Sequence, residues 1–254
     1  MRPTLSLIRR EFSAYFWSPI AYVVLAVFLA VTGHLFYLSL EMLTAKGPKG
    51  ISYPMELIVN SVPFWLVFVS IAPLLTMRLF AEEQSSGTLE MLLTAPVRDW
   101  QVVCAKYVAC YGFYVLMWLP TLLYLPILTD WTWWTLHCEI DPWLIVTTYL
   151  GLALAGAMFL SIGLFISSLV KSQMIAALIS LFLGMFFVVG GIWRPDMDTS
   201  DAPYRVLYYF TVPLHFERSF GRGLIDTRNL ILYGSVALLG LFLTVRSLES
   251  RRWR

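Results

Sequence analysis

Several uncharged apolar runs, each long enough to cross a lipid bilayer, constrain this chain more than any other feature. A spanning helix needs about 20 mostly apolar residues, and such runs lie at 20–40, 57–77, 107–129 and 143–193, with a shorter one at 230–245. The fourth run has 51 residues and is interrupted only by Lys171. As one helix it would measure about 76 Å, against a hydrocarbon core of about 30 Å. We therefore divide it into spans 143–170 and 172–193, which predicts six spans and an all-α polytopic membrane fold.

Composition supports a protein whose solvent is the bilayer. Hydrophobic residues make up 59% of the 254 positions and charged residues 13%, whereas soluble domains are about 25% charged. The net charge of +2 is small and no basic block occurs, so nucleic acid is not an expected partner. The expected partner of the apolar protein surface is the lipid bilayer.

The distribution of Lys and Arg predicts the orientation, because cytoplasmic loops carry more of them. With six spans both termini lie on one side, and that side holds 11 of the 18 basic residues. The other side holds seven, five of them arginines in the loop 194–228. We therefore expect both termini in the cytoplasm.

The first 18 residues allow two interpretations. Arg9, Arg10 and Phe12 fit the core of a twin-arginine export signal. The apolar run that follows has 21 residues, however, whereas the apolar region of a signal peptide has roughly 7–15, and no small-residue cleavage site follows it. Apolar side chains recur instead at helical spacing, at Leu5, Ile8, Phe12 and Phe16. This spacing favours an amphipathic helix lying on the membrane.

Residues that could carry chemistry are few and scattered. His34 lies alone in the first span, His215 is isolated, and His137, Cys138 and Glu139 are adjacent residues that cannot easily face one ion. No lysine follows a glycine in the phosphate-binding pattern G-x4-G-K-[ST]. We expect no catalytic residues, no metal and no cofactor on this chain.

The segment 78–97, RLFAEEQSSGTLEMLLTAPV, is acidic although it separates two apolar runs. Ser85, Ser86, Gly87 and Thr88 can break it into two short helices, with Thr88 as the N-cap of the second, and Pro96 ends it. Leucines on one side of the segment must pack against something. The first alternative is the membrane surface or the ends of the bundle, and the second is a cytoplasmic partner. Periodicity alone favours the first of these.

The segment 194–228 is long and rich in aromatic residues, which suit a membrane–water interface. We expect one or two short interfacial or re-entrant helices there, broken at Pro213 and at residues 221–223. The alternatives are a loop lying on the lipid headgroups and an outer lid on a transport path. The aromatic residues concerned are Tyr204, Tyr208, Tyr209, Phe210, Phe216 and Phe220.

Four stretches resemble the permease subunits of ABC-2 type transporters, in particular those associated with bacterial gliding-motility operons. They are residues 10–28, 78–97, 212–233 and 247–253, of which 78–97 is the most specific because it fits the pattern E-x3-G-T-x-E-x-L-L-x-x-P. The resemblance implies that 1–254 is a single ABC-2 transmembrane domain and that residues 1–18 form an elbow helix. It also implies that 78–97 holds a coupling helix seated in a groove of a separate ATPase.

The coupling role is carried over residue by residue. Glu82 or Glu83 would meet basic groups of the ATPase, Gly87 would permit the turn, and Leu89 and Leu93 would fill the groove. The remaining residues that match the pattern are Thr88, Glu90 and Pro96.

The resemblance also implies a location in the bacterial inner membrane, several partners and a direction of transport. Two ATPase chains would bind the ATP, and a second permease, identical or related, would complete the transport path. The family tends to export, and an extracytoplasmic accessory protein is a further possible partner.

Two other functional classes stay open from the residues themselves. A membrane-embedded enzyme or anchoring subunit would need converging polar residues in the bilayer, and an ion-coupled carrier would need intramembrane Asp or Glu, which the six runs lack.

Overall fold

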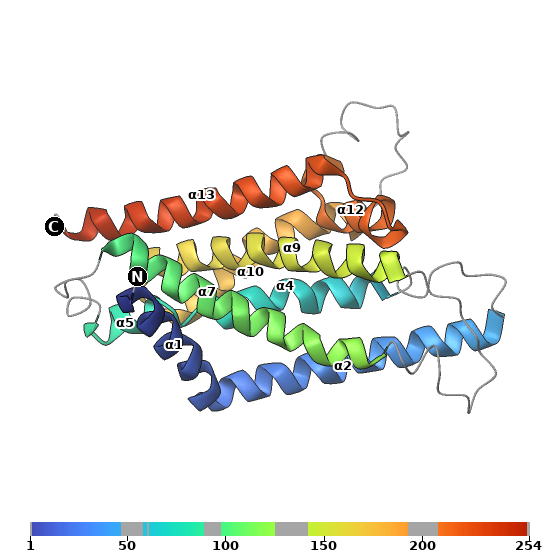
Figure 1. Ribbon diagram of the computed structural model, residues 1–254, viewed down its shortest axis with the longest axis horizontal. Coiled ribbons are helices and arrows are strands. Elements are labelled where there is room, and N and C mark those ends of the chain that lie inside the picture. The colour runs from blue at the N-terminus through green and yellow to red at the C-terminus, as the bar shows by residue number, and fades with distance from the viewer. Residues whose placement is uncertain are drawn as a thin grey trace.

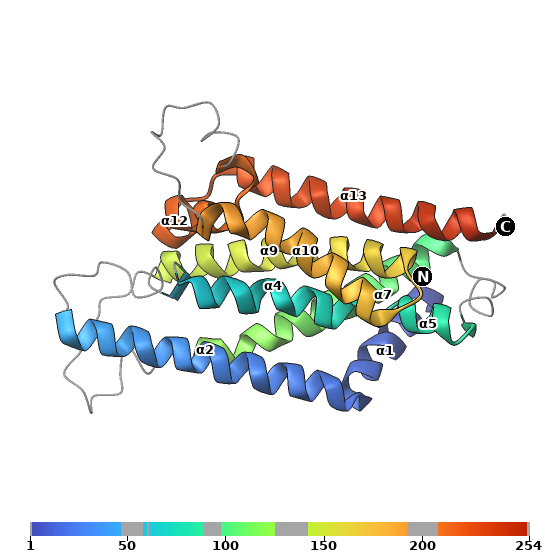
Figure 2. The same cartoon turned by 180° about the vertical axis from the view of Figure 1, so that it is seen from behind.

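The computed structural model describes residues 2–46, 58–59, 61–88, 98–124, 142–192 and 208–252, and every element in these ranges is a helix (Figures 1 and 2). Long helices run side by side along the molecule, and the two chain ends lie at the same end of it. The elements are α1 (Arg2–Trp17), α2 (Pro19–Lys46), α4 (Val62–Thr76), α5 (Ala81–Ser85), α7 (Asp99–Trp118), η1 (Leu119–Leu123), α9 (Pro142–Leu169), α10 (Gln173–Ile192), α12 (Val212–Arg218), η2 (Phe220–Arg222) and α13 (Thr227–Arg252).

Six helical stretches among the described residues are long and apolar enough to cross a membrane, which confirms the predicted number. They are Pro19–Ser39, Val62–Ser85, Asp99–Leu123, Pro142–Leu169, Gln173–Gly190 and Thr227–Ser250. The third and the sixth begin before the uncharged runs that predict them, because a helix continues through charged residues near its ends. The third begins at Asp99 rather than at 107. At this start the Arg98 N–H donates to Gln101 Oε1 over 3.1 Å, and the Asp99 carboxylate suits the positive end of the helix dipole.

Helix α9 lies at the centre of the packing and contacts α4, α7, α10 and α13. Glycines let its neighbours come close, because a Cβ at Gly156 would lie 2.3 Å from the Tyr114 ring and one at Gly163 would lie 2.2 Å from Thr76 Oγ1. Small residues allow such close approach in a lipid environment, where helices are held by packing and hydrogen bonds. Tyr114 uses this proximity to donate a 2.8 Å hydrogen bond to the Leu152 carbonyl.

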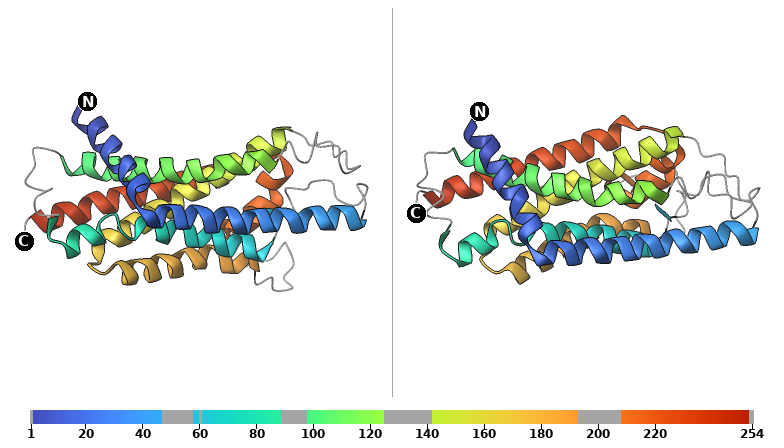
Figure 3. Two further views of the ribbon diagram at one scale, coloured as in Figure 1. Left: turned by 90° about the horizontal axis from the view of Figure 1, so that it is seen from below. Right: turned by 60° about the horizontal axis from the view of Figure 1, so that its bottom comes forward.

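Helix α1 crosses the end of the bundle at a steep angle to α2 and packs on α7 (Figure 3). Phe12 lies over Gly112, and the Tyr15 ring stacks on Phe113 with 5.0 Å between centroids. The predicted apolar stripe is therefore divided between two environments. Phe12 is partly buried against α7, whereas Leu5 is 71% exposed.

The described part of the segment 194–228 contains two short helices, α12 and η2. Phe216 and Phe220 are fully buried, so their side chains pack inside the protein rather than on its surface. They fill the space beside Gly151 of α9, where a Cβ would come within 2.8 Å of the Phe220 ring. Thr147 and Thr148 of α9 fix η2 by donating to the Phe220 carbonyl over 3.0 and 3.3 Å.

His215, which appears isolated in the sequence, is bonded on both ring nitrogens. Nδ1 lies 2.9 Å from the Tyr233 hydroxyl and Nε2 lies 2.8 Å from the Tyr208 carbonyl oxygen. Burial lowers the pKa of His215 to about 4, against smaller opposing effects of the Tyr208 carbonyl and of Asp226. His34 in α2 is exposed, and residues 137–139 lie outside the described ranges.

Candidate functional site

The first half of the segment 78–97 lies where several helices meet, and α10 also packs on α5. The chain leaves α4, turns through residues 77–80, forms α5 and reaches Thr88, the last described residue before 98. The beginning of α7, the end of α9 and helix α1 surround it. Each of these three helices contributes a polar side chain that binds α5 or a residue paired with it.

Lys106 of α7 is the most deeply buried charged group at this site, with its side chain 3% exposed. Its Nζ lies 2.7 Å from Glu83 Oε1 on α5 and 3.3 Å from Glu11 Oε2 on α1. The Phe80 ring lies beneath it, 5.4 Å from Nζ to the centroid. A buried ammonium needs such partners because water is not there to solvate it. One side chain thus joins α1, the segment 78–97 and α7.

The neighbouring cations keep the Glu11 carboxylate in its charged form. Burial by itself would raise its pKa, but the charges and hydrogen bonds of Lys106 and Arg10 outweigh burial and hold the pKa below the usual value of 4.5. Arg10 Nη2 donates to the other carboxylate oxygen over 2.8 Å from the exposed side of α1.

Ser167 at the end of α9 caps α5 from another helix. Its Oγ accepts hydrogen bonds from the backbone N–H groups of Phe80 and Ala81, both over 3.2 Å. The first N–H groups of a helix lack partners within it, and the N-cap residue Phe80 has no side chain that could supply one. Gln84 reinforces the contact by donating to the Ser168 carbonyl over 2.8 Å.

Arg78 and Glu82 form a second ion pair at the start of the segment. Nε and Nη2 of Arg78 lie 2.9 and 3.3 Å from the two oxygens of Glu82, and Nη1 donates to Ser18 Oγ over 3.1 Å. Ser18 joins α1 to α2. The pair therefore holds the corner between these two helices against the end of α4.

Residues 85–88 turn away from the bundle and are exposed. Gly87 has φ +73°, a left-handed conformation that a side chain disfavours. The Ser86 and Thr88 hydroxyls lie 2.9 Å apart, and Ser86 Oγ also donates to the Glu82 carbonyl over 2.9 Å. The helix that Thr88 would cap falls in residues outside the described ranges.

The structure brings four of the eight candidate residues together: Glu82, Glu83, Gly87 and Thr88. Leu89, Glu90, Leu93 and Pro96 lie outside the described residues. Both glutamates expected to meet an ATPase are paired within the chain, Glu82 with Arg78 and Glu83 with Lys106.

Three residues of the site escaped sequence reasoning: Glu11, Lys106 and Ser167. A signal existed for Lys106, because a single lysine interrupts the apolar sequence VVCAKYVAC. None existed for Ser167, whose partners are more than 80 positions away in the sequence.

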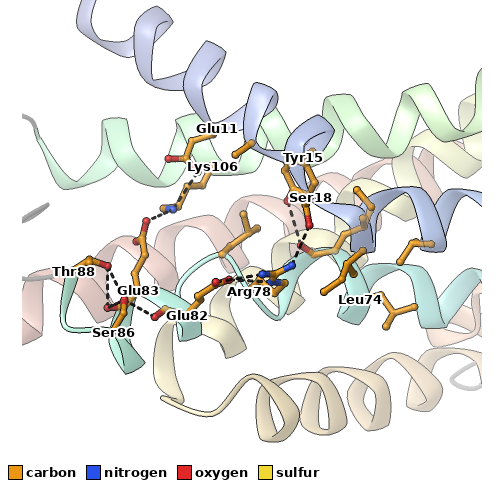
Figure 4. A pocket seen from close by; sticks show the side chains of 16 residues that line it. Glu11, Tyr15, Ser18, Leu74, Arg78, Glu82, Glu83, Ser86, Thr88 and Lys106 are labelled. Atoms are coloured by element: carbon orange, nitrogen blue, oxygen red, sulfur yellow. Dashed lines mark hydrogen bonds and ion pairs between the residues drawn. The ribbon is translucent and has the colours of Figure 1, made fainter.

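A pocket of about 430 Å³ opens beside these ion pairs (Figure 4). Lys106, Glu83 and Thr88 lie toward one end of it and Leu74 toward the other. Its lining residues come from α1, the start of α2, the end of α4, α5 and α7: Glu11, Ala14, Tyr15, Ser18, Ile20, Ala21, Val24, Leu74, Leu75, Arg78, Leu79, Glu82, Glu83, Ser86, Thr88 and Lys106. No group of three or more His, Cys, Asp or Glu placed to hold a metal ion occurs among the described residues.

Comparison with known families identifies the chain. A family described as "ABC-2 family transporter protein" matches residues 56–243, well over half of the sequence and including the whole segment 78–97. The chain belongs to the ABC-2 transporter family. This ABC-2 protein is the membrane domain of a transporter permease, a kind of domain that typically lacks ATPase activity and works with an ATPase partner. A search of curated proteins found no match to the chain.

Proposed function

We propose that this chain is a permease subunit of an ABC exporter of the gliding-motility type, and that its segment 78–97 receives movement from a separate ATPase subunit. In the assembly, two ATPase chains and a second permease, identical or related, join it in the inner membrane. Both termini and the segment 78–97 face the cytoplasm, where ATP is. An extracytoplasmic accessory protein would belong to the opposite side.

The observation that carries the proposal is the attachment of α5 to three other helices. Lys106 ties Glu83 to α7 and, through Glu11, to α1, while Ser167 and Gln84 tie the start of α5 to the end of α9. Packed side chains and hydrogen bonds of this kind transmit displacement between sites. A push on the exposed residues 85–88 is therefore passed to two spans and to the elbow helix at once.

The roles of the glutamates are revised by this geometry. Glu83 points inward to Lys106, so we assign it to anchoring α5 rather than to the ATPase surface. Glu82 has a side chain 47% exposed and can meet a basic group of the ATPase while it keeps its contact with Arg78. Thr88, Leu89, Glu90, Leu93 and Pro96 then form the part of the segment that enters the ATPase groove, beyond the turn at Gly87.

The test is co-purification with the P-loop ATPase that we expect to be encoded next to this permease, followed by measurement of ATPase activity. Glu83→Arg places a second cation beside Lys106, and Gly87→Pro demands a negative φ where the chain has +73°. We expect each variant to lower ATPase activity or recovery of the complex at least fivefold while membrane insertion is unchanged. Glu249→Arg, at the exposed end of α13, is the matched control.

A photo-crosslinking amino acid provides a readout that does not depend on loss of function. Placed at Ser86, it should attach the ATPase subunit, and placed at Leu224, at the far end of the bundle, it should not. Unchanged activity in both variants, together with no ATPase crosslink from position 86, would remove the segment 78–97 from the coupling mechanism.

A further inference from the structure

The pocket beside α5 has an apolar half that opens toward the lipid-facing surface. Ile20 at the start of α2 and Leu74 near the end of α4 are 42% and 41% exposed at its rim, and Val24 and Leu75 are buried behind them. A pocket of about 430 Å³ lies within the range of about 300–1,000 Å³ usual for small-molecule sites. An apolar chain can therefore enter from the bilayer between α2 and α4.

The other half of the pocket is charged and carries both signs. Glu11, Glu82 and Glu83 supply three carboxylates and Arg78 and Lys106 two cations, so the lining is negative by one charge. Arg10 offsets part of this charge, but it lies outside the lining and its side chain is 60% exposed. A ligand with a cationic group suits this end of the pocket better than an anion does.

One atom in this half lacks a partner among the described residues. Both oxygens of Glu11 and both oxygens of Glu82 are bonded to Arg or Lys nitrogens, as is Glu83 Oε1. Glu83 Oε2 is buried and accepts no hydrogen bond. A buried carboxylate oxygen without a donor is costly, so the Glu83 side chain, which is 22% exposed, would gain by turning this oxygen toward a donor in the pocket.

Arg78 provides the complementary feature on the apolar side. Three of its five N–H groups are used, two on Glu82 and one on Ser18, which leaves two that can donate to an anion. Its side chain is 33% exposed, and Figure 4 shows it between Glu82 and Leu74. Along the pocket, Glu83, Arg78 and Leu74 follow one another, which is the order of an ammonium, a phosphate and an acyl chain.

We propose that this pocket binds a bilayer phospholipid whose headgroup ends in a primary ammonium. The ammonium donates to Glu83 Oε2, the phosphate lies near Arg78, and an acyl chain leaves past Ile20 and Leu74. Because Glu83 also binds Lys106, the lipid stabilises α5 in its place on the bundle. This inference requires only that the chain lies in a membrane, and it holds or fails independently of docking by an ATPase.

The test measures lipid binding to the full-length protein, purified in detergent and stripped of lipid, by native mass spectrometry. Phosphatidylethanolamine is compared with phosphatidylcholine and phosphatidylglycerol of the same acyl chains. We expect one phosphatidylethanolamine per chain, bound at least tenfold more tightly than either of the others. Phosphatidylcholine has no N–H donor for Glu83, and phosphatidylglycerol has no cation.

Two variants separate the site from general lipid adhesion. Glu83→Gln should reduce the preference for phosphatidylethanolamine at least fivefold. Leu74→Trp, which narrows the mouth and touches no ion pair, should weaken binding of phosphatidylethanolamine without lowering the unfolding temperature in detergent. Glu249→Gln, at the exposed end of α13, is the control and should bind like the unmodified protein.

Three results would overturn the proposal. The first is a preference for phosphatidylglycerol. The second is binding of phosphatidylethanolamine by both pocket variants that equals binding by the unmodified protein. The third is binding of a long-chain alkylamine, which has no phosphate, as tightly as phosphatidylethanolamine. The last result would make the pocket a site for cationic amphiphiles in general, including transported ones, rather than for a phospholipid of the bilayer.

Discussion

At the scale of single residues, Lys106 dominates the electrostatics of the described structure. Its ammonium is nearly inaccessible, and its two carboxylate partners are 14% and 22% exposed. Removing one member of a buried ion pair leaves uncompensated charge, which costs more than the pair contributes. The two glutamates would then repel each other across the space that Lys106 fills.

Lys106→Met should therefore lower the free energy of unfolding by about 3 kcal/mol, measured as the shift of the thermal midpoint in detergent. Adding Glu83→Gln should recover part of this loss, because one of the two unpaired carboxylates is removed. Arg246→Gln, which breaks the exposed pair with Glu249, is the control and should change the stability by less than about 0.5 kcal/mol. Additive effects of the first two changes would mean that Lys106 and Glu83 do not interact.

His215 gives the fold a dependence on pH. Its pKa is lowered from 6.5 to about 4 by burial, so between these values the unfolded chain binds a proton that the folded chain does not. Stability is then complete above pH 6.5 and falls as the pH drops toward 4. The lowered pKa of Glu11 contributes around and below its usual value of 4.5, so above about pH 5.5 the decline belongs to His215 and not to Glu11.

His215→Gln should flatten the decline of the unfolding midpoint between pH 6.5 and about pH 5.5, above the range in which Glu11 is protonated. The variant keeps a side chain that can donate or accept a hydrogen bond, so its midpoint at pH 7.5 should fall by only a few degrees. A decline that persists unchanged in the variant would assign the effect to another group.

The sequence predicts some of these residues and not others, for reasons that are physical. A span read as an uncharged run ends at the first charge, so that rule places Lys106 in a loop. The helix instead continues to Asp99, and the lysine is tolerated because two carboxylates from distant segments reach it. Glu82, Glu83, Gly87 and Thr88 are recognisable because they lie close together in one pattern. Glu11 and Ser167 become part of the site only through folding.

At the scale of elements, α5 depends on its neighbours for stability. It has five residues, far fewer than the 12–15 or so that an isolated helix needs in water. Its first N–H groups are satisfied by Ser167 of α9, and its third residue is held by Lys106 of α7. Local propensity predicts a break near Gly87 but not where α5 is attached.

Ser167→Ala should leave the N–H groups of Phe80 and Ala81 without an acceptor and cost about 1–2 kcal/mol. Hydrogen exchange should accelerate at residues 80–84 before it does in the long helices, because the loss is local. Ser85→Ala is the matched control, because it removes an exposed hydroxyl whose partner among the described residues is the Glu82 carbonyl. Equal exchange in both variants would show that the contact with α9 does not hold α5.

At the scale of the whole molecule, the number of helices between two points fixes whether they share a side of the membrane. Four span-length helices, α7, α9, α10 and α13, separate the exposed turn at Ser86 from the exposed Ser250 near the end of α13. An even number returns the chain to the same side. Leu224, 61% exposed just before α13, lies one crossing from Ser250 and so faces the other side. The count does not identify the cytoplasmic side, so the predicted side comes from the excess of Lys and Arg near the termini.

Single cysteines at positions 86, 224 and 250, in a chain whose three native cysteines are replaced, make this arrangement measurable with a membrane-impermeant maleimide. Positions 86 and 250 should react in inside-out vesicles and resist labelling in intact cells, and position 224 should do the reverse. Labelling of 86 and 250 from opposite sides would require an odd number of crossings between them and would contradict the six-span arrangement. Labelling of both in intact cells would keep the fold but place Glu83 and α5 away from ATP, and no cytoplasmic ATPase could then act on them.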